Sequence, residues 1–275
     1  MKIGKQAHRS TAISSSNEAT ILVRGRDLCN ELIGAVSFTD HVWLLVTGQL
    51  PSAGQRAVLD ATLVAIAEHG LVPSVQASRM TLAAAPEALQ GAVAAGILGC
   101  GSVILGAAES AGHLLASVVA GAGAGAGERT PAKLDESAAR VVKEHQAARR
   151  AVPGFGHPLH KGHDPRVERL FAVAAQHGVA GEHIAAAQAV ARVLPELSGK
   201  PLAMNVSVGI PAVLLDAGYP LLAMKGVPIL ARTASLIAHL LEEQSKPIGF
   251  VLSHAGAAAI GYDGEAPAGF VPGDH

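Results

Sequence analysis

One short stretch of the chain holds the residue types best suited to chemistry. Residues 152–166 read VPGFGHPLHKGHDPR, and His157 follows a proline and two glycines that fix an irregular backbone. A histidine exchanges protons near neutral pH. Arg166 offers a planar fork for a carboxylate, and Lys161 offers a point charge for a phosphate. We therefore interpret the stretch as an anion-binding loop with an acid–base residue.

Two other interpretations of this loop stay open. His157, His160 and His163 are spaced three residues apart and could ligate zinc. Pro158 and Gly162 interrupt a helix between them, so the three rings need not share a face, and no matching carboxylate–histidine pair occurs elsewhere. The loop could also be purely structural. Anion binding explains the residues best, and we predict no metal.

Composition excludes several classes of protein. The chain has 275 residues, of which 49% are hydrophobic and 16% charged, so it can bury a substantial core and is not mainly disordered. A net charge of −1 and 3% aromatic residues argue against nucleic-acid binding. Cys29 and Cys100 cannot form a disulfide framework, and the polar first residues lack an apolar targeting segment, so we expect a cytoplasmic protein.

Helical patterns dominate and predict a mostly α fold. The expected helices lie within residues 36–51, 54–70, 136–150, 167–177, 182–197, 203–217 and 228–244. The clearest strand is residues 19–24, a short hairpin arm. Residues 91–108 carry no formal charge, but they lack flanking cations and an aromatic belt, so we interpret them as a buried core helix rather than a membrane span. Residues 121–127 alternate glycine and alanine and predict a flexible loop.

The pattern VPGFGH-x6-DPR resembles the signature of the citrate synthase family, and nine positions match with the right gap. Three further segments are similar to family elements in the same order. They are residues 24–51 (RGRDLCNELIGAVSFTDHVWLLVTGQLP), residues 68–70 (EHG) and residues 231–241 (ARTASLIAHLL). The resemblance covers about residues 10–250. The short chain is nearest the small citryl-CoA lyase-like members.

The resemblance implies an all-α fold in which a large helical domain (residues 1–109 and 212–275) is joined to a small helical domain (residues 110–211) that closes over the substrate. It also implies an obligate homodimer. The chemistry would make or cleave a carbon–carbon bond between acetyl-CoA and oxaloacetate. The coenzyme A thioester would be a substrate, with no permanently bound cofactor. Partners would be acyl-CoA and oxaloacetate- or citrate-type molecules, without nucleic acid or membrane.

The same resemblance implies roles for five residues. His157 matches the histidine that exchanges a proton with the oxaloacetate carbonyl, or with the citryl hydroxyl in the cleavage direction. Arg166 and Arg232 match the arginines that clamp substrate carboxylates. His69 matches a histidine that contacts the substrate, and Lys161 matches a cationic position near the coenzyme A phosphates.

Some of these residues also have plainer interpretations. His69 could be a histidine at a helix end, where the dipole favours it, and Arg232 could be a structural arginine in a buried pair. We expect Asp164 to cap or turn the backbone before Pro165 rather than to react. His239 follows Arg232 on the same helix face, where it either supports the site or packs the helix.

The chain departs from the family pattern at two catalytic positions. Leu105 stands where synthases carry the histidine that holds the enolate oxygen, and the cleaving members also lack that histidine. Ser207 stands where the family has an aspartate that moves the methyl proton. We therefore predict a citrate synthase-like or citryl-CoA lyase-like enzyme. The alternatives are a non-catalytic member that binds acyl-CoA or a tricarboxylate, and an enzyme with an altered acyl-CoA substrate.

Overall fold

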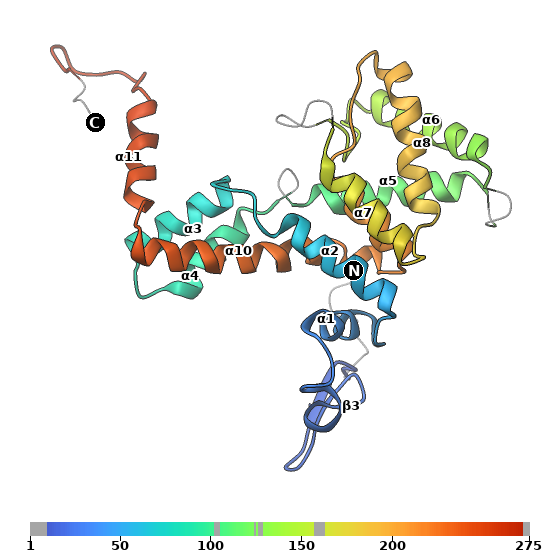
Figure 1. The fold of residues 1–275 in the computed structure, drawn as a ribbon. Coiled ribbons are helices and arrows are strands. Elements are labelled where there is room, and N and C mark those ends of the chain that lie inside the picture. Colours follow the sequence, from blue (N-terminus) through green and yellow to red (C-terminus); the bar gives the residue numbers. More distant parts are fainter. Residues whose placement is uncertain (1–9, 102–104, 124, 126–128, 157–162, 272–275) are drawn as a thin grey trace. The chain divides into compact units, whose positions relative to one another are not determined.

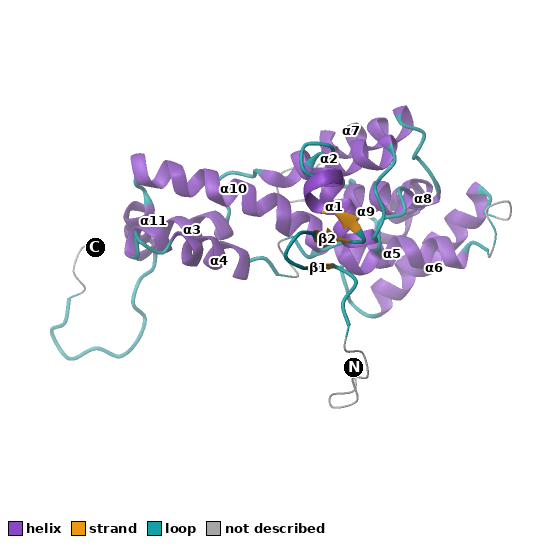
Figure 2. Cartoon of the chain, turned by 90° about the horizontal axis from the view of Figure 1, so that it is seen from below, coloured by secondary structure: helices purple, strands orange, loops and turns teal. Residues whose placement is uncertain are grey.

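Helices make up most of the chain (Figures 1 and 2). The computed structural model describes residues 10–101, 105–123, 125, 129–156 and 163–271. Its N-terminal part contains β1 (Ser14–Ser16), β2 (Ile21–Val23), β3 (Arg26–Asp27), the π-helix η1 (Leu28–Leu32), α1 (Phe38–Thr47), α2 (Ala53–Ala67), α3 (Pro73–Ala84), α4 (Leu89–Leu98) and α5 (Ala107–Gly121). There follow α6 (Pro131–Ala147), α7 (Pro165–Gln176), α8 (Glu182–Ser198), α9 (Val206–Asp216), the 3-10 helix η3 (Leu221–Ala223), α10 (Gly226–Ser245) and α11 (Gly249–Ala259). The all-α prediction is confirmed.

The helices begin and end where local chemistry favours it. Ser37 and Asp40 form a capping box at the start of α1, and Gly48 ends that helix in the left-handed conformation with φ +83°. Gly199 ends α8 in the same way. The predicted strand is confirmed as β2, which pairs antiparallel with β1 and β3 in a three-stranded sheet. Cap residues that sequence inspection can read therefore set many of the element boundaries.

Residues 91–108 do not form the single helix that we predicted. Helix α4 ends at Leu98 and α5 begins only at Ala107. Gly99 and Gly101 follow α4, and glycine costs a helix about 1 kcal/mol per residue relative to alanine. An uninterrupted apolar run is thus split by its glycines.

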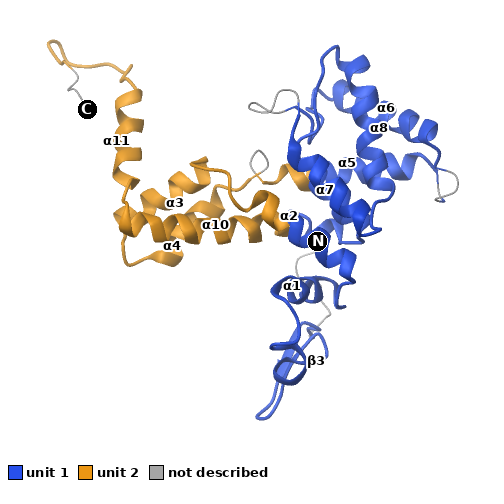
Figure 3. Ribbon diagram, viewed as in Figure 1, with its two compact units in different colours: residues 1–62, 111–224 blue, residues 63–110, 225–275 orange. Residues whose placement is uncertain are grey.

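The chain divides into two compact units (Figure 3). Unit 1 comprises residues 1–62 and 111–224. In it, α8 packs against α6 and α9, and α7 packs against α9. Leucine and valine side chains on these helices and on α5 are fully buried, namely Leu115, Val118, Val142, Leu194 and Leu214. The domain segments predicted from the sequence stay a prediction.

Unit 2 comprises residues 63–110 and 225–275, and α3, α4, α10 and α11 build it. Gly96 of α4 lies where three elements meet. A Cβ atom there would come within 2.7 Å of the Leu236 side chain on α10 and 2.9 Å of the Ser74 carbonyl oxygen on α3. The missing side chain therefore lets α4 pack tightly against both helices. Leu82, Ala92 and Leu240 form a buried cluster in the same unit.

Among the described residues, one helical segment is long and apolar enough to cross a membrane by length and composition. It runs from Leu221 to Ser245 with a mean hydropathy of 1.4, and it includes the buried Arg232. The core helix of a soluble protein passes the same test.

Candidate functional site

The predicted site residues fall on both units. His157 and Lys161 lie outside the described residues. Arg166 belongs to unit 1, whereas His69 and Arg232 belong to unit 2. Each unit therefore carries its own part of the predicted set of residues.

In unit 1, the segment just before His157 is tied to the start of α9. The Gly156 N–H donates to the Ala203 carbonyl at 2.8 Å, and the Asn205 N–H donates to the Gly154 carbonyl at 2.9 Å. The Asn205 side-chain amide donates to the Gly156 carbonyl at 2.7 Å, while its oxygen accepts the Ser207 N–H and caps α9. Asn205 thus connects the backbone before His157 to the first turn of α9.

Two glycines make this close approach possible. Gly154 and Gly156 have φ +85° and +80°, a conformation that side chains rarely adopt. A Cβ atom on Gly154 would come within 2.4 Å of the Val208 Cβ and 2.9 Å of the Val208 backbone nitrogen. The glycine spacing of the loop therefore serves packing against α9.

Asp164 holds the other end of the loop. It caps α7, as predicted, by accepting the Arg166 N–H at 3.1 Å. Its two oxygens also accept the Arg166 Nε and Nη2 groups at 2.9 Å each, and one accepts the Val206 N–H at 2.9 Å. Burial would raise the pKa of Asp164, but these hydrogen bonds and the Arg166 charge lower it overall. A buried carboxylate therefore fixes the guanidinium that we assign to a substrate carboxylate.

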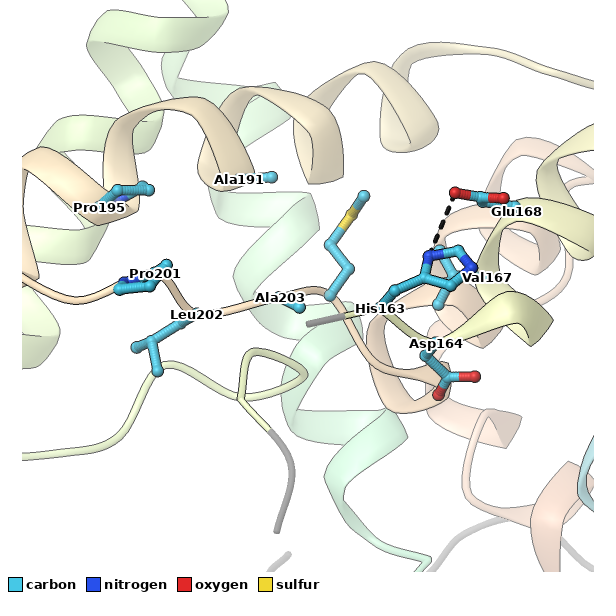
Figure 4. Close-up of a pocket in the computed structure, with 10 residues that line it drawn as sticks. His163, Asp164, Val167, Glu168, Ala191, Pro195, Pro201, Leu202 and Ala203 are labelled. Carbon is cyan, nitrogen blue, oxygen red and sulfur yellow. Dashed lines mark ion pairs between the residues drawn. The ribbon is translucent and has the colours of Figure 1, made fainter. Parts of the chain in front are cut away.

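A cavity of about 410 Å³ opens beside this end of the loop (Figure 4). Its lining includes His163 and Glu168, whose side chains face each other at 3.2 Å, together with apolar groups from α8 and residues 201–204. Its volume lies within the range of small-molecule sites. His163 belongs to the triplet considered for zinc; the other two histidines lie outside the described residues.

In unit 2, Arg232 is a buried charge without a hydrogen-bond partner at two of its nitrogens. The residue is 3% exposed, and its Nε and Nη1 atoms meet no acceptor in the described part of the chain. Because buried charges are normally paired, an unpaired guanidinium indicates a place for an anionic ligand group. Arg232 forms no ion pair in the described structure, so the interpretation as a buried pair has no support there.

Cys100 is a buried neighbour of this arginine. Burial raises the pKa of its thiol, although the charges of Arg232 and Lys225 act in the opposite direction. The thiol lies 3.4 Å from the Gly96 carbonyl oxygen. Cys100 therefore remains a neutral thiol beside a cation, which makes it unreactive packing rather than a nucleophile.

His69 lies in an exposed turn just after α2. Gly70 ends this turn with φ +69°, as expected for a cap glycine. The preceding Glu68 is tied to α10, because its carboxylate accepts hydrogen bonds from Ser235 and from the His239 Nε2 atom at 3.0 Å. His239 is thus hydrogen-bonded to the residue before His69, and its support of the site stays a prediction.

The two departures from the family pattern have distinct structural settings. Leu105 has φ +69°, an unusual backbone for a branched residue, just before α5. Ser207 stands in the first turn of α9, where Asn205 accepts a hydrogen bond from its backbone N–H. Neither side chain offers a carboxylate or an imidazole at its position.

Sequence inspection missed three residues that the structure makes important. Asn205 fastens the loop, Asp164 binds the Arg166 side chain as well as capping α7, and Glu68 joins the His69 turn to α10. Asn205 and Glu68 both lie next to positions that were aligned with family elements, so the alignment contained a signal for them. The roles of Asn205 and Glu68 depend on hydrogen bonds between residues 49 to 171 positions apart, which no local pattern predicts.

Each unit offers a cation that suits a carboxylate. Arg232 is a buried cation whose Nε and Nη1 atoms have no acceptor among the described residues. Arg166 is a cation whose side chain is hydrogen-bonded to Asp164. Oriented cations of this kind stabilise charge on bound carboxylates and developing oxyanions. Across the described residues, no group of three His, Cys, Asp or Glu side chains could hold a metal ion.

Comparison with known proteins gives a consistent result. The model of the citrate synthase C-terminal domain matches residues 52–249. Citryl-CoA lyase from Hydrogenobacter thermophilus is 29% identical, with a TM-score of 0.82 over 95% of this chain and 97% of that chain. ATP citrate lyase from Methanosaeta concilii, solved with (3S)-citryl-CoA, is 20% identical, with a TM-score of 0.74 over 96% of this chain and 43% of that chain.

More distant structures share the fold. Citrate synthase from Thermotoga maritima is 19% identical, with a TM-score of 0.63 over 86% of this chain and 60% of that chain. Among curated protein sequences no relative was found.

Proposed function

The chain belongs to the citrate synthase family, and from that premise we propose that it cleaves citryl-CoA into acetyl-CoA and oxaloacetate or runs the reverse reaction. One observation carries the preference for cleavage. The Hydrogenobacter citryl-CoA lyase matches over nearly the whole of both chains, whereas the Thermotoga synthase is matched over 60% of its length. Leu105, in place of the synthase histidine, supports the same preference.

The proposed roles follow from the candidate residues of each unit. Arg232 binds a carboxylate with its unpaired Nε and Nη1 atoms, and Arg166 binds another. His157 takes the proton of the citryl hydroxyl as the carbon–carbon bond breaks. The hydroxyl carbon becomes the ketone of oxaloacetate, and the electron pair passes to the thioester enolate, which gains a proton to give acetyl-CoA.

The remaining proposals concern the thioester and the state of the protein. Lys161 is assigned to the coenzyme A phosphates, and the cavity of about 410 Å³ beside the loop is a candidate for part of the thioester. We propose a homodimer without a permanently bound cofactor. A cytoplasmic setting is supported by Cys29 and Cys100, both of which are free.

A direct assay tests the proposed reaction. Purified protein is given citryl-CoA, and separately acetyl-CoA with oxaloacetate, while release or consumption of oxaloacetate and thioester is followed. We expect turnover of citryl-CoA and its loss in His157→Ala, because that residue accepts the hydroxyl proton. Absence of turnover in both directions, or full activity in His157→Ala, would contradict the proposal.

A second candidate function is a non-catalytic binder of acyl-CoA or a tricarboxylate. It is favoured by Ser207, because a neutral serine without a partner is a poor base for moving a methyl proton. Calorimetry with citrate and coenzyme A distinguishes the candidates: binding without turnover supports the binder. Turnover of another acyl-CoA with a keto acid would instead support an altered substrate.

A further inference from the structure

The Glu68 carboxylate accepts hydrogen bonds from three donors within unit 2. Two come from α10, namely the Ser235 hydroxyl and the His239 Nε2 atom at 3.0 Å. The third is the Gly70 backbone N–H at 2.5 Å, two residues further along the chain. Burial would raise the pKa of Glu68, but these hydrogen bonds lower it overall, so the group is a carboxylate at neutral pH. Charged acceptors make the stronger class of hydrogen bond.

Arg79 fixes the proton on His239. Its Nη1 atom lies 3.5 Å from the His239 Nδ1 atom, and an arginine can only donate. Nδ1 therefore acts as the acceptor, which places the proton on Nε2, pointing at Glu68. Arg79 is itself buried and held by Glu243 at 2.6 Å and by Glu242 at 2.8 Å. The direction of the His239–Glu68 hydrogen bond is thus set by a buried ion-pair group.

Hydrogen bonds hold the turn that carries His69 both before and after this residue. Glu68 joins α10 on one side, and its bond to the Gly70 N–H closes the turn around His69. Beyond Gly70, the Val72 N–H donates to the Gly70 carbonyl at 2.8 Å, and the Gln76 amide donates to the Leu71 carbonyl at 2.6 Å. The backbone on either side of His69 is therefore fixed relative to the helix that carries Arg232.

Arg232, Ser235 and His239 share one face of α10, because they lie three and seven residues apart. The same helix face thus carries the unpaired guanidinium and the two side chains that bind Glu68. The His69 turn and the unpaired guanidinium are therefore both attached to this one helix.

We propose that Glu68 is a positioning residue, which aligns His69 with Arg232 through its hydrogen bonds to Ser235, His239 and the Gly70 N–H. The identity of the ligand rests on the proposed function, whereas the alignment is a property of the free protein. Losing the carboxylate loosens the turn and weakens the substrate contact of His69 while the fold of unit 2 persists, since the Glu68 side chain is 55% exposed.

Hydrogen exchange tests the alignment without any ligand. The Gly70 amide is protected in the wild type by its bond to Glu68, and we expect its exchange in Glu68→Ala to be faster by about tenfold or more. Glu87→Ala, at an exposed position of the same unit, serves as the matched control and leaves the rate unchanged. Equal Gly70 exchange in Glu68→Ala and the wild type would overturn the positioning role.

A double-mutant cycle tests whether Glu68 acts through His69. Citrate affinity, measured by calorimetry, is expected to fall about tenfold in both Glu68→Ala and His69→Asn, because each loses the same contact with the ligand. The double variant should bind no more weakly than His69→Asn alone. Additive losses would overturn the proposal, as would unchanged affinity in His69→Asn. Wild-type protein that neither binds citrate nor turns over citryl-CoA would overturn the proposed function, and Gly70 exchange then still reports on the alignment.

Two substitutions of His239 test whether its hydrogen bonds or only its size hold the turn in place. A glutamine can donate to Glu68 and accept from Arg79, as the Nε2-protonated imidazole does. We expect His239→Gln to keep Gly70 protection and citrate affinity within about threefold, whereas His239→Leu loses both. Equal behaviour of the two variants would contradict the role given to this hydrogen bond.

Discussion

At the scale of the residue, Arg232 combines burial with missing partners. Its guanidinium is 3% exposed, and Nε and Nη1 find no acceptor among the described residues. Taking such a charge out of water costs several kcal/mol unless it is paired. The free protein therefore carries an energetic cost at this position, which a bound carboxylate would offset.

Arg232→Met tests whether the buried charge destabilises the free protein and strengthens the binding of a carboxylate. We expect citrate affinity to fall roughly 100-fold, because charge-assisted hydrogen bonds are worth about 1.5–3 kcal/mol each. The melting temperature of the free protein should stay equal or rise, because an unpaired buried charge is removed. Calorimetry and thermal unfolding measure the two effects. Arg192→Met, which removes an exposed ion pair with Asp135, is the control and should leave citrate affinity unchanged. A large loss of stability in Arg232→Met would instead indicate a structural arginine.

The sequence predicted candidate residues better than it predicted their contacts. Arg166, Arg232 and His69 stand in short patterns that could be matched by eye. The roles of Glu68 and Asn205 could not be predicted in this way, although both stand in or beside matched segments, because their partners lie on α10 and on the loop before His157. Hydrogen bonds between segments distant in sequence depend on how helices pack, and residue types alone do not determine that packing.

At the scale of the element, the loop before His157 depends on Gly154. Gly154→Ala adds a Cβ within 2.4 Å of the Val208 Cβ, in a conformation with φ +85°. We expect a loss of about 3 kcal/mol or more in the free energy of unfolding, with reduced citryl-CoA turnover. Gly178→Ala is the matched control, because φ is +66° there but nothing lies within 4 Å. It should cost only about 1 kcal/mol and leave turnover unchanged, and equal losses would argue against the packing role of Gly154.

A second element-scale contact joins α3, α10 and the start of α11. Buried Glu243 accepts hydrogen bonds from Arg79 at 2.6 Å and from the Ile248 and Gly249 N–H groups at 2.9 and 2.7 Å. Burial would raise the pKa of Glu243, but these bonds and the Arg79 charge lower it below the usual 4.5. The charged carboxylate therefore contributes stability that is complete above that value and is lost as the pH falls through the lowered pKa.

Glu243→Gln measures this contribution. At neutral pH the variant should be less stable by about 3 kcal/mol, because Arg79 keeps its buried charge and loses a charged partner. As the pH falls below 4.5, the difference from the wild type should shrink, because the wild-type carboxylate becomes protonated as well. Denaturant unfolding at a series of pH values checks both statements. A difference that does not change with pH would show that the carboxylate charge is irrelevant.

Most helices with a polar face were predicted, whereas α3 and α11 were missed and α4 was predicted only as part of one longer helix. Helices α6, α7, α8 and α10 alternate apolar and polar residues at helical spacing, and their predicted spans agree within a few residues with the structure. Helices α4 (LQGAVAAGIL) and α11 (GFVLSHAGAAA) are almost uniformly apolar and small, so they show little periodicity. Their helical state comes from packing in unit 2 rather than from a local pattern.

At the scale of the whole molecule, exposed apolar side chains concentrate in unit 2. Among the described residues, nineteen large hydrophobic residues are exposed, and thirteen of them belong to this unit, which is the smaller of the two. Val64 on α2 is 80% exposed and Leu98 at the end of α4 is 86% exposed. Exposed apolar patches mark protein–protein contacts, and unit 2 carries most of the exposed apolar side chains of the described residues. We therefore place the subunit contact of the proposed homodimer on unit 2.

Light scattering across a concentration series tests this arrangement. We expect the wild type to be a dimer and the variant Val64→Lys/Leu98→Lys to shift toward monomer, because a lysine pair cannot be desolvated in an apolar contact without cost. Leu222→Lys is the matched control, since that leucine is 91% exposed in unit 1 and should leave the dimer intact. A wild type that stays monomeric at every concentration would contradict the homodimer, and a double variant that stays dimeric would place the contact on another surface.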